Sequence, residues 1–218
     1  MNYSEYMSNI VEVFPTGVPI FTENIVKTIS AEIGVPTEEI KSIVNLNLKR
    51  LADDNAIERI QKGVYYKPKM TAFGKTKPPF DQIINETCIV QNNTKIGYIG
   101  GETLLHDLGL TSLIPKNRVI VTNKYRTKLP QEAHTVLKKS VIKITDENAR
   151  YLQIIDAIAM LDTEYVDANQ PEKIIRHWVD KFELDRLTII KLANRHYPQR
   201  VLFAVLETIL EDNYDITH

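Results

Sequence analysis

Two helical stretches separated by a three-residue breaker constrain the fold of this chain more than any other feature. In the first stretch, isoleucines recur at steps of four from Ile25 to Ile33, and the second stretch begins at Thr37. Between them stands Gly34-Val35-Pro36, in which glycine suits a helix C-terminus and proline cannot continue a helix. Two short amphipathic helices joined by so tight a turn are typical of a helix-turn-helix.

The ends of these helices and the next segment can also be predicted. Thr22 and Thr37 are expected N-caps, because a threonine side chain accepts a hydrogen bond from a free N–H group of the first turn. Two short β-prone runs, 57–60 and 64–66, then surround a turn that contains glycine, which predicts a β-hairpin. Another short helix is expected over 4–13. This element order is that of a winged helix-turn-helix domain.

The second helix carries residue types that read DNA on the side away from its apolar stripe. A recognition helix needs an apolar face toward its own domain and a small polar or basic face toward the major groove. Asparagine bonds bidentately to adenine, and basic side chains reach phosphates. The competing interpretation is a helix pair whose basic side only faces solvent. The expected DNA-binding residues are Thr37, Lys41, Ser42, Asn45, Lys49, Arg59, Lys62 and Lys67.

Charge is distributed unevenly along a chain that is neutral overall, with 27 Lys+Arg and 28 Asp+Glu, so a histone-like coat protein is excluded. Residues 41–77 hold nine basic and three acidic residues, and residues 116–143 hold eight and one. The chain from residue 146 onward is acidic, with eight basic and fourteen acidic residues. We expect contacts with polyanions in the two basic stretches. Within 1–75 the charges cancel, and if Glu38, Asp53 or Asp54 lies near DNA, a modest and steeply salt-dependent affinity is expected.

The second basic stretch suggests another surface. Its basic residues border two expected strands, so that their side chains could line one side of a sheet. They either keep that side soluble or form a second nucleic-acid-binding surface. The candidate residues are Lys116, Arg118, Lys124, Arg126 and Lys128.

The remaining pattern completes an α+β fold. We expect a linker at 71–79, helices at 81–91 and 102–108, strands near 96–101, 118–122 and 140–144, and only helices from 145 onward. The fold class is therefore α+β, an N-terminal winged helix-turn-helix followed by a small mixed sheet with C-terminal helices. The expected domains are 1–75, for DNA binding, and 76–218, which ends in a helical bundle.

Catalytic and metal-binding patterns are weak. Gly100-Gly101 before a helix could expose N–H groups to an anion, and polymerase-β-like nucleotidyltransferases have a similar turn. Those enzymes need paired carboxylates for Mg²⁺, whereas no Asp-x-Asp occurs here. The nearest approximations, 162–164 and 183–185, are expected to cap helices. The five histidines lack metal-ligand spacing. We therefore expect neither an enzyme nor a metal or other cofactor.

Three segments resemble the AbiEi-type antitoxins of type IV, or abortive infection, toxin–antitoxin systems, which defend bacteria against phage. They are Ile25–Pro68, with LADDNAIERIQKGVYYKP, then Gly97–Asn123, GYIGGETLLHDLGLTSLIPKNRVIVTN, and Tyr197–Glu211, YPQRVLFAVLETILE. The resemblance implies an N-terminal domain that represses its own operon at inverted repeats in double-stranded DNA. It also implies a C-terminal domain that antagonises a nucleotidyltransferase toxin, with or without a direct complex. Symmetric repeats are read by symmetric pairs, so a dimer is expected on DNA.

Two other functions stay open: a winged-helix transcription factor that senses a small ligand through its C-terminal domain, and an accessory protein that binds a toxin directly. No apolar run approaches the 18 or so residues that span a bilayer, so no membrane partner is expected. Met1–Glu5 lacks the features of a secretory signal, and Cys88 is the single cysteine. The expected location is the cytoplasm.

Overall fold

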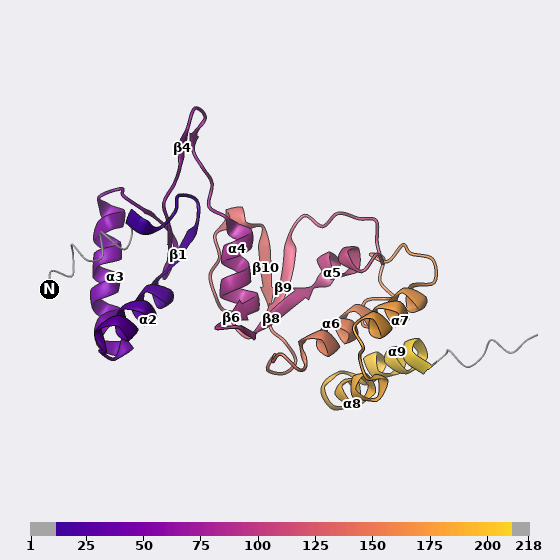
Figure 1. Cartoon of the computed structure of the whole chain (residues 1–218). Coiled ribbons are helices and arrows are strands. Elements are labelled where there is room, and N and C mark those ends of the chain that lie inside the picture. The colour runs from indigo at the N-terminus through magenta and orange to yellow at the C-terminus, as the bar shows by residue number, and fades with distance from the viewer. Residues whose placement is uncertain (1–11, 211–218) are drawn as a thin grey trace, which may run out of the picture. The chain divides into compact units, whose positions relative to one another are not determined.

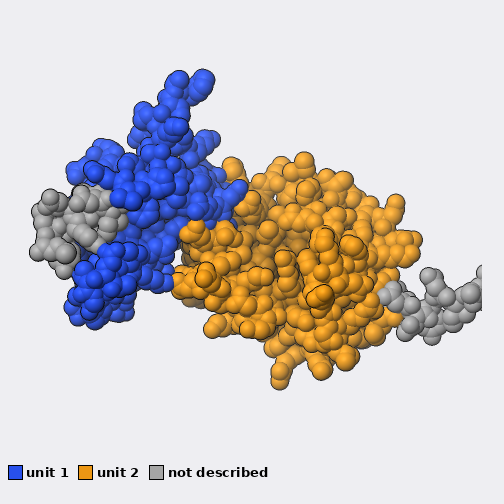
Figure 2. All heavy atoms as spheres, viewed as in Figure 1, with its two compact units in different colours: residues 1–84, 128–133 blue, residues 85–127, 134–218 orange. Residues whose placement is uncertain are grey.

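The computed structural model describes residues 12–210, which form two compact units (Figure 2). The N-terminal unit comprises residues up to Ile84 together with Lys128–Ala133, and the C-terminal unit comprises Asn85–Thr127 and the residues from His134. Both units combine helices with strands, so the α+β class is confirmed. The assignment of separate functions to 1–75 and 76–218 stays a prediction. The helix expected over 4–13 lies outside the described residues except for its last two, which are helical.

The N-terminal unit contains the predicted helices and hairpin (Figure 1). Its three-stranded sheet has the order β1-β3-β2, and β3 pairs antiparallel with both neighbours. The elements, in chain order, are β1 (Pro19–Phe21), α2 (Thr22–Ile33), α3 (Thr37–Asp53), β2 (Glu58–Gln61) and β3 (Val64–Tyr66).

An apolar core joins α2 to α3. Ile25 and Ile29 of α2 pack with Ile40, Val44 and Leu48 of α3, and each is at most 2% exposed. The steps of four between these residues place them on one face of each helix. The helical periodicity therefore predicted this core correctly.

The turn between α2 and α3 depends on Gly34. Its φ of 68° lies in the left-handed region, and its N–H donates to the Ser30 carbonyl at 3.0 Å. The Ser30 hydroxyl also donates to the carbonyl of Val35 at 2.7 Å. These bonds end α2 and turn the chain directly into α3, as the breaker predicts.

The predicted N-caps are wrong by one residue. Phe21 and Pro36 occupy the N-cap positions, so Thr22 and Thr37 are the first helical residues. For α2 the reason is the adjacent hairpin: the Thr22 N–H donates to the Gly63 carbonyl at 2.9 Å. A backbone partner thus replaces the expected side-chain cap.

The linker predicted at 71–79 is also wrong, because part of it forms a second hairpin. Strands β4 (Met70–Thr71) and β5 (Gly74–Lys75) pair antiparallel. The helix expected at 81–91 is shorter, since α4 (Phe80–Ile84) passes into the π-helical turn η1 (Asn85–Ile89). In 71–79 the glycine and the lysines are typical of a linker, and for that reason the sequence did not predict the β4–β5 hairpin.

The C-terminal unit has the mixed sheet that the sequence predicts, with one strand misplaced. Strands β8 (Gly97–Gly100) and β9 (Arg118–Thr122) pair antiparallel, and β10 (Thr135–Lys138) pairs parallel with β9. No strand forms at 140–144, because the Asn123 side chain bonds both the N–H and the carbonyl of Ile144 at 2.9 Å. A small hairpin, β6 (Val90–Gln91) with β7 (Thr94–Lys95), was not predicted.

The helices expected after residue 145 are confirmed, and their apolar faces form the largest core. Helix α6 packs against the other helices that follow β8. Leu187 of α8 is 63% exposed, while Ile189 and Ala193 of the same helix are buried. The helices are α5 (Gly101–Asp107), α6 (Ala149–Ile158), α7 (Pro171–Lys181), α8 (Arg186–His196) and α9 (Gln199–Leu210), and a 3₁₀ turn, η2 (Gln131–Ala133), precedes β10.

Close packing against β9 explains the Gly100-Gly101 pair. A Cβ at Gly100 would lie 2.7 Å from a Val121 methyl, and one at Gly101 would lie 2.9 Å from a Val119 methyl. Gly101 also has a φ of +58°, which favours glycine. The pair therefore has a packing role, and the anion site suggested by the sequence is not needed to explain it.

Candidate nucleic-acid interface

One face of α3 carries the predicted base-reading residues, and it is exposed. Lys41, Ser42, Asn45 and Lys49 all face solvent among the described residues. At about 100° per residue they span an arc that starts at Lys41, beside the buried stripe, and reaches Lys49 and Ser42, opposite Ile40. The structure thus brings these four residues together on one side of a single helix.

Two asparagines of α3 have different roles. Asn47 is 5% exposed, and its side-chain amide donates to the carbonyl of Ile43 at 2.9 Å. Asn45 points to the opposite side and is exposed. Asn45 is therefore the one of the two that can meet a base edge.

Glu38, one of the acidic residues that the sequence analysis considered near DNA, shares this face. Glu38 lies one turn before Ser42, and it is exposed. Hydrogen bonds from its own backbone amide and from the Thr37 hydroxyl, at 3.0 Å, lower the pKa of Glu38. Thr37, half-buried, is thus engaged by this carboxylate.

The other predicted DNA contacts lie on the first hairpin. Arg59 on β2 and Lys62 in the turn are exposed, whereas Lys67, just after β3, is half-buried. The turn closes through Gly63 with a φ of +77°. These three residues do not share the face of α3, so their expected role is phosphate contact.

The residues of the second basic stretch are not gathered into one cluster. Lys116 and Arg118 lie at the start of β9, whereas Lys124 and Arg126 follow its end. A five-residue strand separates the pairs by roughly 16 Å. Lys128 begins the segment that belongs to the N-terminal unit. Whether the five residues act as one surface stays a prediction.

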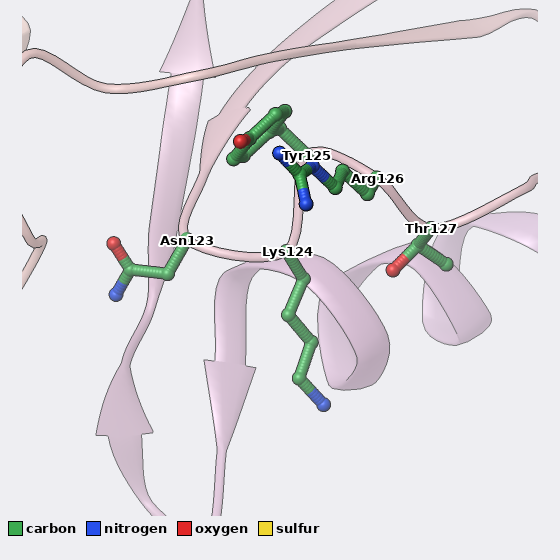
Figure 3. A pocket seen from close by; sticks show the side chains of 5 residues that line it. All are labelled: Asn123, Lys124, Tyr125, Arg126 and Thr127. Atoms are coloured by element: carbon green, nitrogen blue, oxygen red, sulfur yellow. The ribbon is translucent and has the colours of Figure 1, made fainter.

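An open pocket of about 490 Å³ lies beside the loop that follows β9 (Figure 3). The Tyr125 ring lies 5.4 Å from the Arg126 guanidinium and 5.8 Å from the Lys139 ammonium, which are cation–π distances. Figure 3 shows the Lys124 side chain pointing away from Tyr125 and Arg126. The lining residues are Asn123, Lys124, Tyr125, Arg126 and Thr127.

A bonded carboxylate inside the C-terminal unit was missed by the sequence reasoning. Tyr98 and Tyr197 donate their hydroxyls to Asp156 at 2.7 and 2.8 Å. Burial raises the pKa of Asp156, although both hydrogen bonds oppose the shift. Its position within an apolar run, Ile154 to Ile158, was the available signal. Asp156 thus accepts from two tyrosine hydroxyls, one at each carboxylate oxygen, which fits a structural network.

Two further groups with possible chemistry, Asp185 and Cys88, have structural roles: one caps a helix and the other is buried in the core. Asp185 caps α8 as expected, accepting a bond from the Thr188 N–H at 2.8 Å. Cys88 is buried, and burial raises the pKa of its thiol to about 11. Across residues 12–210, the acidic, histidine and cysteine side chains form no group of three or more that could hold a metal ion. No helix in that same range has the length and apolar character needed to cross a bilayer.

Comparison with known proteins places the chain in a family. None of the curated proteins matches this sequence. A family model does match, over residues 8–187, which is most of the chain and includes α3, the three hairpins and the mixed sheet. The chain therefore belongs to DUF6088, a family of unknown function.

Proposed function

We propose that this protein is a DNA-binding transcriptional regulator whose α3 enters the major groove. The observation that carries the proposal is the exposed face of Lys41, Ser42, Asn45 and Lys49, opposite a helix face that is fully packed. The element order, in which β1 precedes a tight helix pair and the β2–β3 hairpin follows it, supports a winged helix-turn-helix.

The polar and the basic side chains of the proposed interface have different roles in DNA binding. Asn45 and Ser42 supply hydrogen bonds to base edges, which carry sequence information. Lys41 and Lys49 reach phosphates on either side of the groove, and the hairpin residue Lys62 reaches the backbone beyond it. Phosphate contacts set the affinity and its salt dependence, while the two polar side chains set the sequence.

A pair of protomers fits the expected operator. Inverted repeats present two equivalent half-sites, about 34–36 Å apart when they are separated by one helical turn. Two copies related by a two-fold axis place one α3 on each half-site. The proposed target is therefore an inverted repeat in the protein's own promoter.

The resemblance to AbiEi-type antitoxins extends the proposal to the C-terminal unit. We propose that this unit counteracts a nucleotidyltransferase toxin encoded by a neighbouring gene, and that the protein is a cytoplasmic regulator and not an enzyme. The support is the likeness of Gly97–Asn123 and Tyr197–Glu211 to that family. Lys124 and Arg126, on the loop after β9, are the basic groups proposed to contact a toxin or its RNA.

The proposed DNA binding is tested with the full chain and a duplex from upstream of its own gene. A mobility shift that survives an excess of scrambled duplex of equal composition is expected. Equal competition by the scrambled duplex would contradict sequence-specific binding. The comparison is made at several salt concentrations, because affinity without the salt concentration has no fixed meaning.

The antitoxin arm is tested by co-expression with the adjacent gene product. The chain should restore growth, and exchange of Lys124, Arg126 and Lys128 for glutamate should abolish the rescue while operator binding persists. If rescue survives this exchange, these three basic residues do not take part in the antitoxin function.

A ligand-sensing regulator is the second candidate, and the open pocket beside Tyr125 favours it. Cations against an aromatic ring suit an anionic, planar ligand. A metabolic operon next to the gene, and release of DNA when such a ligand is added, would support the sensor over the antitoxin.

A further inference from the structure

The β4–β5 hairpin presents apolar side chains to solvent at its tip. Phe73, in the turn, is 101% exposed, and Met70 of β4 is 68% exposed. Figure 1 shows this hairpin standing away from the three-stranded sheet of its own unit. Single apolar residues are ordinary on a surface, but a fully exposed phenylalanine keeps a large apolar area in water. The folded chain therefore makes no use of Phe73 in its core.

The tip has a defined shape. The Thr71 hydroxyl donates to the carbonyl of Gly74 at 2.7 Å, and the Phe73 N–H donates to the Thr71 hydroxyl oxygen at 3.2 Å. Gly74 has a φ of +99°, a conformation that only glycine adopts readily. These bonds hold the turn in place, so the aromatic ring is presented on an ordered support.

The base of the hairpin is fixed to the sheet of the same unit. The Lys75 ammonium lies 2.7 Å from the Glu58 carboxylate on β2, and the Tyr66 hydroxyl of β3 donates to the carbonyl of Thr76. The Thr76 N–H also donates to the carbonyl of Lys69 at 3.0 Å. The hairpin is thus a fixed extension of the unit that carries α3.

Charge identifies what the tip can bind. Residues 61–80 contain five lysines and no acidic residue. Lys69 and Lys77, on the two arms of the hairpin, are exposed. An apolar protein surface would match Phe73 but not the surrounding cations. Stacked bases behind two rows of phosphates match both features, because apolar wedges between base steps and basic contacts to the backbone characterise minor-groove binding.

We propose that the β4–β5 hairpin inserts Phe73, with Met70 beside it, into a base step from the minor groove and thereby bends the operator. Lys69 and Lys77 bind the phosphates on each side. This inference rests on the proposed function, since it requires that α3 binds DNA. It adds a second contact site, which reads deformability of the DNA and not base edges.

The test uses the full chain on the upstream duplex, labelled at both ends for energy transfer. Copies of the duplex that carry 2-aminopurine at successive positions report unstacking. Wild-type protein should shorten the end-to-end distance and brighten 2-aminopurine at one step. Phe73→Ala should remove both signals and weaken binding by roughly 5- to 50-fold, while the salt slope stays unchanged. Phe73→Leu, which keeps an apolar wedge, should retain part of the bend.

Two controls separate the wedge from other effects. Lys69→Ala should lower the salt slope by about one unit and keep the bend. Leu187→Ala removes another exposed apolar side chain, on α8, and should change neither signal. Because Phe73 and Leu187 are exposed, unchanged thermal unfolding should accompany both substitutions.

The outcomes distinguish this inference from the proposed function. Sequence-specific binding with the same bend in wild type and Phe73→Ala would overturn the inference alone. Failure of the wild-type chain to bind any duplex specifically would overturn both. Loss of self-association or of toxin rescue in Phe73→Ala, with the bend intact, would assign the hairpin to a protein partner and overturn the wedge.

Discussion

In the N-terminal unit the polar side chains of α3 face outward from an apolar core, whereas in the C-terminal unit several polar side chains are bonded inside the fold. Asn45 is exposed and Asp156 is held by two tyrosine hydroxyls. Asn123 bonds both backbone groups of Ile144, and the Gln153 amide donates to the Ile99 carbonyl. The polar side chains on the α3 face are free to bind a ligand, whereas Asp156, Asn123 and Gln153 already form hydrogen bonds within the C-terminal unit.

This difference predicts how substitutions should divide. Exchanges of polar residues on α3 should change DNA binding and leave the free energy of unfolding nearly unchanged. Exchanges within the bonded network of the C-terminal unit should lower that free energy first. Each substitution below tests one side of this division.

The largest expected effect is at Gly97. A Cβ there would lie 2.1 Å from the Cys88 carbonyl oxygen and 2.9 Å from that of Val121, so β8 would have to move. Gly97→Ala should destabilise the protein by about 3 kcal/mol in urea unfolding. Gly34→Ala, where φ is +68° but the surrounding space is open, should cost about 1 kcal/mol. Equal losses would show that close packing of β8 is not the reason for glycine.

The next effect concerns Asp156. Asp156→Ala leaves the hydroxyls of Tyr98 and Tyr197 without their shared acceptor, and should cost about 2–3 kcal/mol. Asp162→Ala, an exposed carboxylate, is the matched control and should be nearly neutral. If both substitutions had the same effect on urea unfolding, the network would not be structural.

The same residue predicts a pH dependence. Burial raises the pKa of Asp156, so the folded protein holds its proton more tightly than the unfolded chain does. Its contribution to stability is therefore greatest at low pH and falls as pH rises from the ordinary pKa of 3.8 through the raised value. Asp156→Asn should remove this part of the stability–pH curve. If stability instead rose with pH in the wild type, and this rise disappeared in Asp156→Asn, the predicted direction of the pKa shift of Asp156 would be contradicted.

The smallest effect is at Glu38. Its lowered pKa keeps it negative on the face proposed to meet DNA. Glu38→Gln should raise the affinity for all duplexes by roughly threefold at low salt, with little effect at high salt. Glu32→Gln, on α2, serves as the charge-matched control. If only Glu32→Gln improved binding, α3 would not be the face near DNA.

Local signals predicted the helices, the Gly34 turn and the first hairpin, because each depends on neighbours in sequence. The signals failed where a distant group decides the structure. The Asn123 side chain satisfies Ile144 and prevents a strand at 140–144, and the Gly63 carbonyl replaces the cap expected from Thr22. The residues of the α3 face were found from their spacing, whereas Phe73 escaped notice because its exposure is known only from coordinates.

The most direct measurement of the central claim compares Asn45→Ala with Lys62→Ala in titrations on the upstream duplex and on its scrambled counterpart. Asn45→Ala should reduce the ratio of the two affinities, with a loss of about 1–3 kcal/mol of discrimination at one base pair. Lys62→Ala should weaken both duplexes alike and lower the salt slope by about one unit. An unchanged ratio in Asn45→Ala, with normal folding, would contradict the assignment of α3 as the recognition helix.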